Sequence, residues 1–184
     1  GGVLIDLRVD EERVRLLKDI ALNLTDITLN ERQMCDLELL ATGAFSPLKG
    51  FMTRSDYESV LDRMRLQNDV LWPIPICMDV DELQARSFEA GQSVALRDPE
   101  GYLLAVMHIE DIWKADRQKE ATQVYGTTDR NHPGTDYLFS RGGHYYLGGA
   151  LEVISTPLHF DFKQLRMTPE EIRAAFKKLG WKRM

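Results

Sequence analysis

The stretch SVALRDPEGYLLAV, residues 93–106, places two apolar runs on either side of a four-residue turn. Pro99 takes the second position of this turn and Gly101 the fourth, and both residues favour these positions in type I turns. The flanking runs are short, apolar and bounded by turn residues, as strands are. The stretch therefore predicts a β-hairpin with strands at residues 93–97 and 102–106.

Helices are predicted on both sides of the hairpin because each begins with a capping signal. A capping side chain accepts a hydrogen bond from a backbone N–H of the first turn that has no partner within the helix. Asn30 and Gln33 have the spacing of a capping box, as do Thr168 and Glu171. The predicted helices follow Asp10, Asn30, Thr53, Asp81 and Thr168, and another is expected over residues 115–125.

Three further strands complete the predicted elements. Residues 3–9 alternate apolar and polar side chains, and residues 72–76 form an extended segment whose two prolines suit the edge of a sheet. A long loop over residues 126–143 precedes a strand that ends at Ile154. The glycine pairs 142–143 and 148–149 bracket residues 144–147 and permit a bulge or a close backbone crossing. Strands interleaved with helices, without a regular βαβ alternation, predict an α+β fold.

Composition indicates a soluble globular protein. The chain has 184 residues, enough for one domain or for one domain and the start of another, and is 43% hydrophobic and 28% charged. It contains no apolar run long enough to cross a membrane, and its first residues lack the pattern of a signal peptide. Cys35 and Cys77 lie in apolar sequence and are expected to be buried and reduced. A cytoplasmic protein without a membrane partner is predicted.

The net charge of −6 is unevenly distributed. Seven basic and two acidic residues from Lys163 onward give +5, which leaves −11 for the rest of the chain. An acidic body disfavours nucleic acid as a partner, because phosphate neutralisation supplies most non-specific affinity for it. The basic tail is interpreted either as a solvated helix face or as a surface that meets an anionic site or a partner domain.

Motifs of catalysis are not found. Residues 43–50 superficially resemble a phosphate-binding loop, but Lys49 follows proline and leucine instead of glycine, and no serine or threonine follows it. The four histidines lack the spacing of a zinc site, and no nucleophile elbow is present. His108 and His159 are interpreted as structural. The residues alone therefore predict an α+β domain with no active site of its own.

One loop has the composition of a functional segment. Thr127, Thr128, Asp129, Arg130 and His132 lie in the stretch TTDRNHPG, residues 127–134. Functional loops often have such polar side chains, but a loop held by its own side-chain hydrogen bonds has the same composition. Both interpretations are open at this stage.

Four segments of the chain carry a family resemblance. They are LNERQMCDLELLATGAFSPLKGFM at residues 29–52, LWPIPI at residues 71–76, YGTTDRNHPG at residues 125–134 and YYLGG at residues 145–149. In this order and spacing they resemble ATP sulfurylase (sulfate adenylyltransferase), and the second has a form typical of bacterial members. The resemblance runs from near the start of the chain to Met184.

The resemblance implies a PUA-like domain over residues 1–165, a mixed β-barrel-like sheet with peripheral helices. Residues 166–184 are then a helix that leads into a catalytic nucleotidyltransferase domain. The whole enzyme of this family converts sulfate and ATP, used as MgATP, to adenylyl sulfate and pyrophosphate in sulfate assimilation. Its catalytic residues lie in the catalytic domain, so the resemblance assigns no catalytic, cofactor-binding or metal-binding residue to this chain.

The implied role is structural. The chain is expected to pack against the catalytic domain of the same polypeptide, with the loop of Thr127, Thr128, Asp129, Arg130 and His132 at the interdomain surface, and to be inactive alone. Homo-oligomer contacts remain open. The alternatives are a PUA-type RNA-binding module and a non-catalytic interaction domain, because a shared fold does not fix function.

Overall fold

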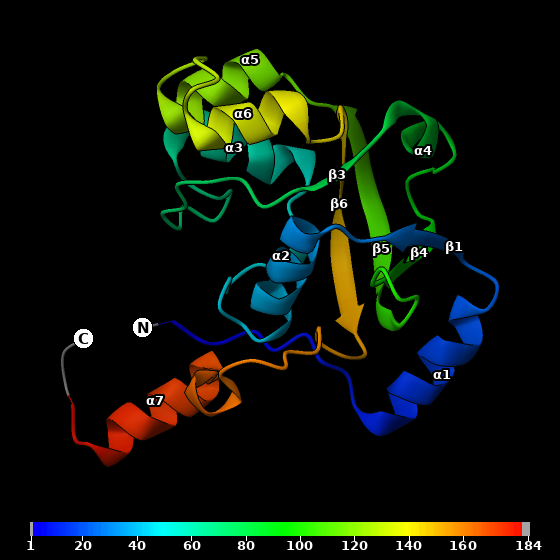
Figure 1. Ribbon diagram of the computed structural model, residues 1–184, viewed down its shortest axis with the longest axis vertical. Coiled ribbons are helices and arrows are strands. Elements are labelled where there is room, and N and C mark those ends of the chain that lie inside the picture. The colour runs from blue at the N-terminus through cyan, green and yellow to red at the C-terminus, as the bar shows by residue number, and fades with distance from the viewer. Residues whose placement is uncertain (1, 182–184) are drawn as a thin grey trace. The chain divides into compact units, whose positions relative to one another are not determined.

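The computed structural model describes residues 2–181, and Figure 1 shows their helices and strands coloured along the chain. Residues 182–184, part of the predicted closing segment, lie outside the described residues. In chain order the elements are α1 (Glu11–Ala21), β1 (Thr25–Thr28), α2 (Glu31–Ala41), β2 (Gly50–Phe51), α3 (Arg54–Arg63), β3 (Met78–Val80), α4 (Glu82–Arg86), β4 (Ser93–Arg97), β5 (Leu103–Lys114), α5 (Arg117–Glu120), a π-helical turn (Ala121–Tyr125), α6 (Pro133–Ser140), β6 (Tyr145–Val153), a 3-10 turn (Lys163–Leu165) and α7 (Pro169–Lys178).

The strands form one mixed sheet, and the α+β prediction is confirmed. The strand order is β1-β4-β5-β6-β2, with β3 paired to β6. β1 runs parallel to β4, with Thr25 opposite Val94, whereas β3 runs antiparallel to β6. The order is linear and ends at β1 and β2, so the sheet of the described residues is open and does not close into a barrel.

The predicted hairpin is present as β4 and β5. Its turn is closed by two backbone hydrogen bonds, from Gly101 N–H to Asp98 O at 3.0 Å and from Asp98 N–H to Tyr102 O at 3.1 Å. Gly101 has φ +91°, a conformation that costs glycine little. β5 continues to Lys114, well beyond the predicted end of the strand.

Capping explains where most helices begin. Gln33 N–H donates to Asn30 Oδ1 at 2.9 Å while Asn30 N–H donates to Gln33 Oε1 at 3.0 Å, which is the predicted capping box of α2. The predicted helix starts of α1, α4 and α7 are confirmed by the same kind of contact. α3 begins where predicted, but the hydroxyl of Thr53 contacts Ser55 Oγ at 3.0 Å and does not cap the helix.

The chain forms two compact units. The first comprises residues up to 50, residues 93–107 and residues from 151 onward. Its core is apolar: side chains of α1, α2, β4 and the first half of β5 are almost completely buried, among them Leu17, Leu37, Leu96 and Leu104. Burial of each such side chain contributes about 1.5–3 kcal/mol to folding.

The second unit comprises residues 51–92 and 108–150 and has a polar centre within its core. The Glu120 carboxylate, 8% exposed, accepts hydrogen bonds from the hydroxyls of Tyr57 at 2.9 Å and Tyr146 at 2.8 Å. Trp113 packs against both tyrosine rings, with centroid distances of 5.5 and 5.7 Å. Burial raises the pKa of both tyrosines, and the negative charge of Glu120 raises it further.

Two predicted strands are wrong. Within the described part of the chain, residues 3–9 make one β-bridge, Arg8 to Val153, because Leu7 N–H donates to Ala41 O at the end of α2 rather than to a neighbouring strand. Residues 72–76 form no strand, because Pro73 and Pro75 have no N–H to donate to a ladder.

The predicted loop over residues 126–143 is also wrong, since it contains α6. The helix predicted over 115–125 is present as α5 and the π-helical turn that follows it. Cys77 is buried as predicted, whereas Cys35 is exposed on α2. Among the described residues, the helices are all too short or too polar to span a membrane.

Candidate functional site

The five residues singled out in the sequence lie on one loop of the second unit, between the π-helical turn and α6. Thr128, Asp129, Arg130 and His132 are exposed, and Thr127 is half-buried. The loop thus presents its polar side chains at the surface of its unit, where they are accessible to a partner.

Local hydrogen bonds fix the loop's conformation. Thr127 Oγ1 accepts from Asp129 N–H at 3.0 Å, and Asp129 Oδ1 accepts from the backbone and side-chain amides of Asn131 at 2.9 and 3.0 Å. These bonds from Asn131 lower the pKa of Asp129. The Arg130 guanidinium donates to Ser140 Oγ on α6. The loop is therefore ordered by its own side chains, as the structural interpretation of its sequence requires.

His132 is the residue that starts α6. Its Nδ1 accepts from Thr135 N–H at 3.4 Å, and its ring lies 5.0 Å from the Tyr125 ring, measured between centroids. Pro133 takes the first position of the helix, which suits it because that position needs no N–H. With Nδ1 as the acceptor, the neutral imidazole carries its proton on Nε2.

Replacement of His132 by alanine is expected to lower the free energy of unfolding by about 0.5–1 kcal/mol, because the cap of α6 is lost and the cap bond is long. Replacement by asparagine, a preferred capping residue, should cost less than half of that. Urea denaturation of both variants measures the difference. Equal losses for the two variants would show that packing on Tyr125, and not the cap, is the main contribution of His132.

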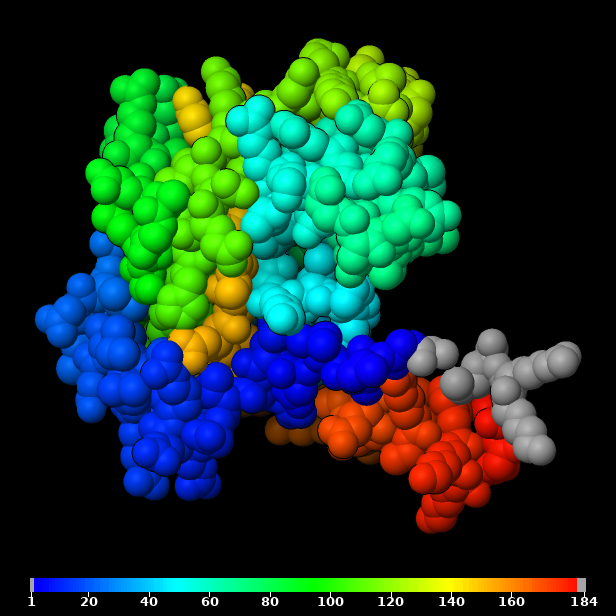
Figure 2. All heavy atoms as spheres, turned by 180° about the vertical axis from the view of Figure 1, so that it is seen from behind, coloured from blue at the N-terminus to red at the C-terminus, as the bar shows by residue number. Residues whose placement is uncertain are grey.

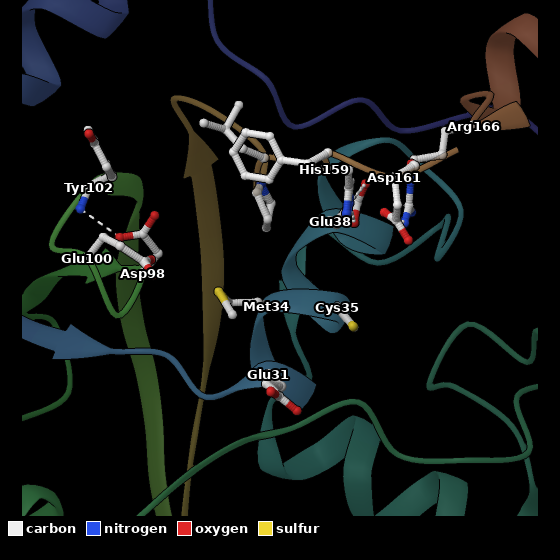
Figure 3. Close-up of a pocket in the computed structure, with 13 residues that line it drawn as sticks. Glu31, Met34, Cys35, Glu38, Asp98, Glu100, Tyr102, His159, Asp161 and Arg166 are labelled. Carbon is white, nitrogen blue, oxygen red and sulfur yellow. Dashed lines mark hydrogen bonds and ion pairs between the residues drawn. The ribbon is translucent and has the colours of Figure 1, made fainter. Parts of the chain in front are cut away.

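A second candidate site lies in the first unit, where a groove of about 880 Å³ opens beside α2. Its lining comes from three segments, namely α2, the β4–β5 turn and an irregular stretch after β6, residues 156–167, which we call the strap. α2 contributes Glu31, Met34, Cys35 and Glu38; the turn contributes Asp98, Glu100 and Tyr102; the strap contributes Pro157, Leu158, His159, Phe160, Asp161 and Arg166. Figure 3 shows the turn residues on one side of the groove and the α2 residues on the other.

The strap is tied to α2 by a hydrogen-bonded contact between His159 and Glu38. His159 Nε2 lies 2.9 and 2.8 Å from the two carboxylate oxygens of Glu38, and in Figure 3 the two side chains point toward each other. Within the strap, Arg166 Nη2 donates to Asp161 Oδ1 at 3.0 Å, and this hydrogen bond lowers the pKa of Asp161. His159 therefore joins the strap to α2 and also lines the groove.

The groove is acidic. Among the described residues that line it, five are carboxylates and Arg166 is the one lysine or arginine. Such a lining repels anions, since the Coulomb energy between like charges is unfavourable and grows as water is excluded. The described residues contain no cluster of three or more His, Cys, Asp or Glu side chains able to hold a metal ion. The groove therefore suits a cationic or apolar group better than a phosphate or sulfate.

Sequence patterns did not predict the groove. Its lining is contributed by segments near residues 31–38, 98–102 and 157–166, and no local motif links them. A usable signal was the run of large apolar residues after β6, where Leu158 and Phe160, which line the groove, are 77% and 83% exposed. Apolar side chains that a fold leaves uncovered at such density mark an interaction surface.

Comparison with known proteins identifies the class to which this fold belongs. Residues 1–156 match the family described as PUA-like domain, and the chain belongs to that family.

Within that class, the chain is similar over its full length to proteins named sulfate adenylyltransferase. It is 42% identical to the sulfate adenylyltransferase of Mycosarcoma maydis and 42% identical to that of Schizosaccharomyces pombe, and covers 33% and 38% of those proteins. A solved structure, described as hexameric APS kinase from Thiobacillus denitrificans, aligns with the whole chain at 36% identity and a TM-score of 0.77, over 32% of its own length. The chain thus spans about a third of the length of these relatives.

Proposed function

We propose that the chain is the amino-terminal accessory domain of a sulfate adenylyltransferase. The observation that carries the proposal is full-length similarity, at 40–44% identity, to proteins of that name that are about three times as long. The parent enzyme converts MgATP and sulfate to adenylyl sulfate and pyrophosphate during sulfate assimilation in the cytoplasm. These 184 residues support the reaction without performing it.

The chemistry of the groove supports a non-catalytic role. Adenylyl transfer to sulfate passes through a highly anionic transition state, which requires positive charge and oriented hydrogen-bond donors. The groove of the first unit instead presents five carboxylates and one guanidinium. The catalytic residues are thus expected in the remainder of the parent polypeptide.

α7 supports the division between residues 1–165 and 166–184. The helix has a capping box and an apolar face, yet none of its residues is buried, and Leu179 and Trp181 after it are 61% and 58% exposed. Helices of about ten residues are marginal in water unless an apolar face packs against a partner. These features support the assignment of α7 to the segment that leads into the catalytic domain, against which its apolar face is proposed to pack.

The loop that includes Thr127, Thr128, Asp129, Arg130 and His132 is assigned to the interdomain surface of the parent. Its exposure supports this role, and its internal hydrogen bonds give it a fixed shape for docking. His132→Asn keeps the cap of α6 but removes the imidazole. A change in the parent's turnover in this variant, without a change in melting temperature, would support the assignment.

Activity and binding assays test the proposed function. The 184-residue chain is expected to bind neither ATP nor adenylyl sulfate in isothermal titration and to release no pyrophosphate, whereas the full-length parent does both. Sulfate-dependent release of pyrophosphate by the parent is the required positive result. Turnover by the 184-residue chain alone would contradict the accessory role, and a parent without this activity would contradict the proposed reaction.

A further inference from the structure

The groove beside α2 has an apolar mouth that the described part of the first unit leaves uncovered. Tyr102, Leu158 and Phe160 are 67%, 77% and 83% exposed and line the same hollow. Tyr102 comes from the β4–β5 turn and the other two from the strap, so the apolar surface crosses from one element to another. Exposed apolar surface shared between elements is typical of a docking site.

The strap is held in one position although its side chains face outward. The contact of His159 with Glu38 joins it to α2, and Lys163 Nζ lies 5.5 Å from the centroid of the Phe160 ring. Beyond the strap, the Arg173 side chain of α7 donates a hydrogen bond to the carbonyl oxygen of Gly2 at 2.7 Å. Figure 2 shows the blue N-terminal segment lying against the orange strap and α7. The groove is thus a preformed surface, which lowers the entropic cost of docking.

The charges around the mouth define the chemistry of a partner. Glu31 and Glu100 are exposed and line the groove, and neither forms an ion pair with the rest of the described chain. Burial of these carboxylates under a neutral partner would cost free energy that no contact offsets. A partner that covers the mouth must therefore bring lysine or arginine beside apolar side chains.

We propose that the groove receives a basic, apolar segment from the remaining two-thirds of the same polypeptide. The inference rests on the proposed function, because it takes this chain to be part of a longer enzyme. Two observations favour this occupant over a second copy: the relatives are about three times as long, and the strap that walls the groove leads directly into α7. The domain that follows α7 is therefore held close to the mouth of the groove.

Hydrogen exchange of the strap tests the proposal. In the full-length parent, backbone amides of residues 156–167 should exchange about tenfold more slowly than in the 184-residue chain, because the docked segment covers them. Phe160→Ser and Glu100→Lys in the parent should each remove most of that protection. Equal exchange in the parent and in the 184-residue chain would overturn the proposal.

Matched variants separate docking from general effects of the substitutions. Phe162→Ser removes a phenyl ring that is 67% exposed but does not line the groove, and Glu89→Lys makes the same charge change at an exposed site elsewhere. Both should leave the protection intact, and loss of protection in either would count against the groove. Protection that appears in the 184-residue chain with rising concentration would identify a second copy as the occupant and overturn the assignment.

The pyrophosphate assay keeps this inference separate from the proposed function. A parent that turns over sulfate while its strap exchanges freely would refute only the docking inference. A parent with a protected strap and no sulfurylase activity would refute only the proposed reaction.

Discussion

Replacement of Gly149 by alanine is expected to lower the free energy of unfolding by about 3 kcal/mol or more, beyond the usual cost of overpacking. A Cβ atom at this position would lie 1.9 Å from the carbonyl oxygen of His108 and 3.0 Å from the backbone nitrogen of Glu110. These are backbone atoms of β5, so no side-chain rotation relieves the clash, and β6 must move away from β5. Urea denaturation of the variant measures the loss.

Two further glycines provide a second test and a control. Gly148→Ala should be similarly damaging, because its Cβ would lie 2.3 Å from the carbonyl oxygen of Met52. Gly101→Ala places a Cβ in open space at φ +91° and should cost about 1 kcal/mol, which is the backbone penalty alone. A Gly149→Ala loss no greater than that of Gly101→Ala would show that the strands separate easily at this point.

These glycines illustrate what the sequence could predict. The pattern indicated a bulge or a close backbone crossing at Gly148 and Gly149, and the geometry confirms the close crossing. Capping residues located the starts of α1, α2, α4 and α7, and the turn residues located the hairpin. These signals are local: the physical cause and its effect lie within a few residues of each other.

The failures have causes that are not local. α6 was missed because its cap is His132, which is not among the preferred capping residues. A strand was wrongly predicted at residues 3–9, because the backbone hydrogen bonds of this segment are shared between the end of α2 and β6. The groove was missed because it depends on three segments that meet only in the folded chain. The periodicity of apolar residues along the chain does not reveal contacts between segments that are distant in sequence.

Replacement of Glu120, at the polar centre of the second unit, is also expected to lower the free energy of unfolding strongly. Glu120→Leu is expected to lower the free energy of unfolding by about 3 kcal/mol, because the hydroxyls of Tyr57 and Tyr146 are left buried without their acceptor, and each costs about 1–3 kcal/mol. Glu120→Gln keeps an acceptor oxygen and should cost about 1 kcal/mol. Chemical denaturation at pH 7 compares the two variants.

A triple variant separates lost hydrogen bonds from lost packing. Adding Tyr57→Phe and Tyr146→Phe to Glu120→Leu removes both orphaned hydroxyls, and replacement of a hydrogen-bond acceptor together with its donors by apolar groups can be nearly neutral. The triple variant should therefore regain most of the stability lost by Glu120→Leu. If it remains as unstable as the single variant, the loss comes from altered packing against Trp113 and not from the hydroxyls.

Alkaline pH tests the same cluster independently. The tyrosine pKa values decide whether stability rises or falls as the pH increases. Burial raises the pKa of Tyr57 and Tyr146 in the folded protein, whereas in the unfolded chain tyrosine ionises near pH 10. Their contribution to stability is therefore complete below about pH 10 and is lost as the pH rises further, by about 1.4 kcal/mol per pH unit for each tyrosine. The Tyr57→Phe/Tyr146→Phe variant should lose stability less steeply above pH 10 than the unsubstituted 184-residue chain. Equal slopes for the two proteins would mean that these tyrosines ionise without unfolding the second unit, and that the Glu120 cluster is open to water.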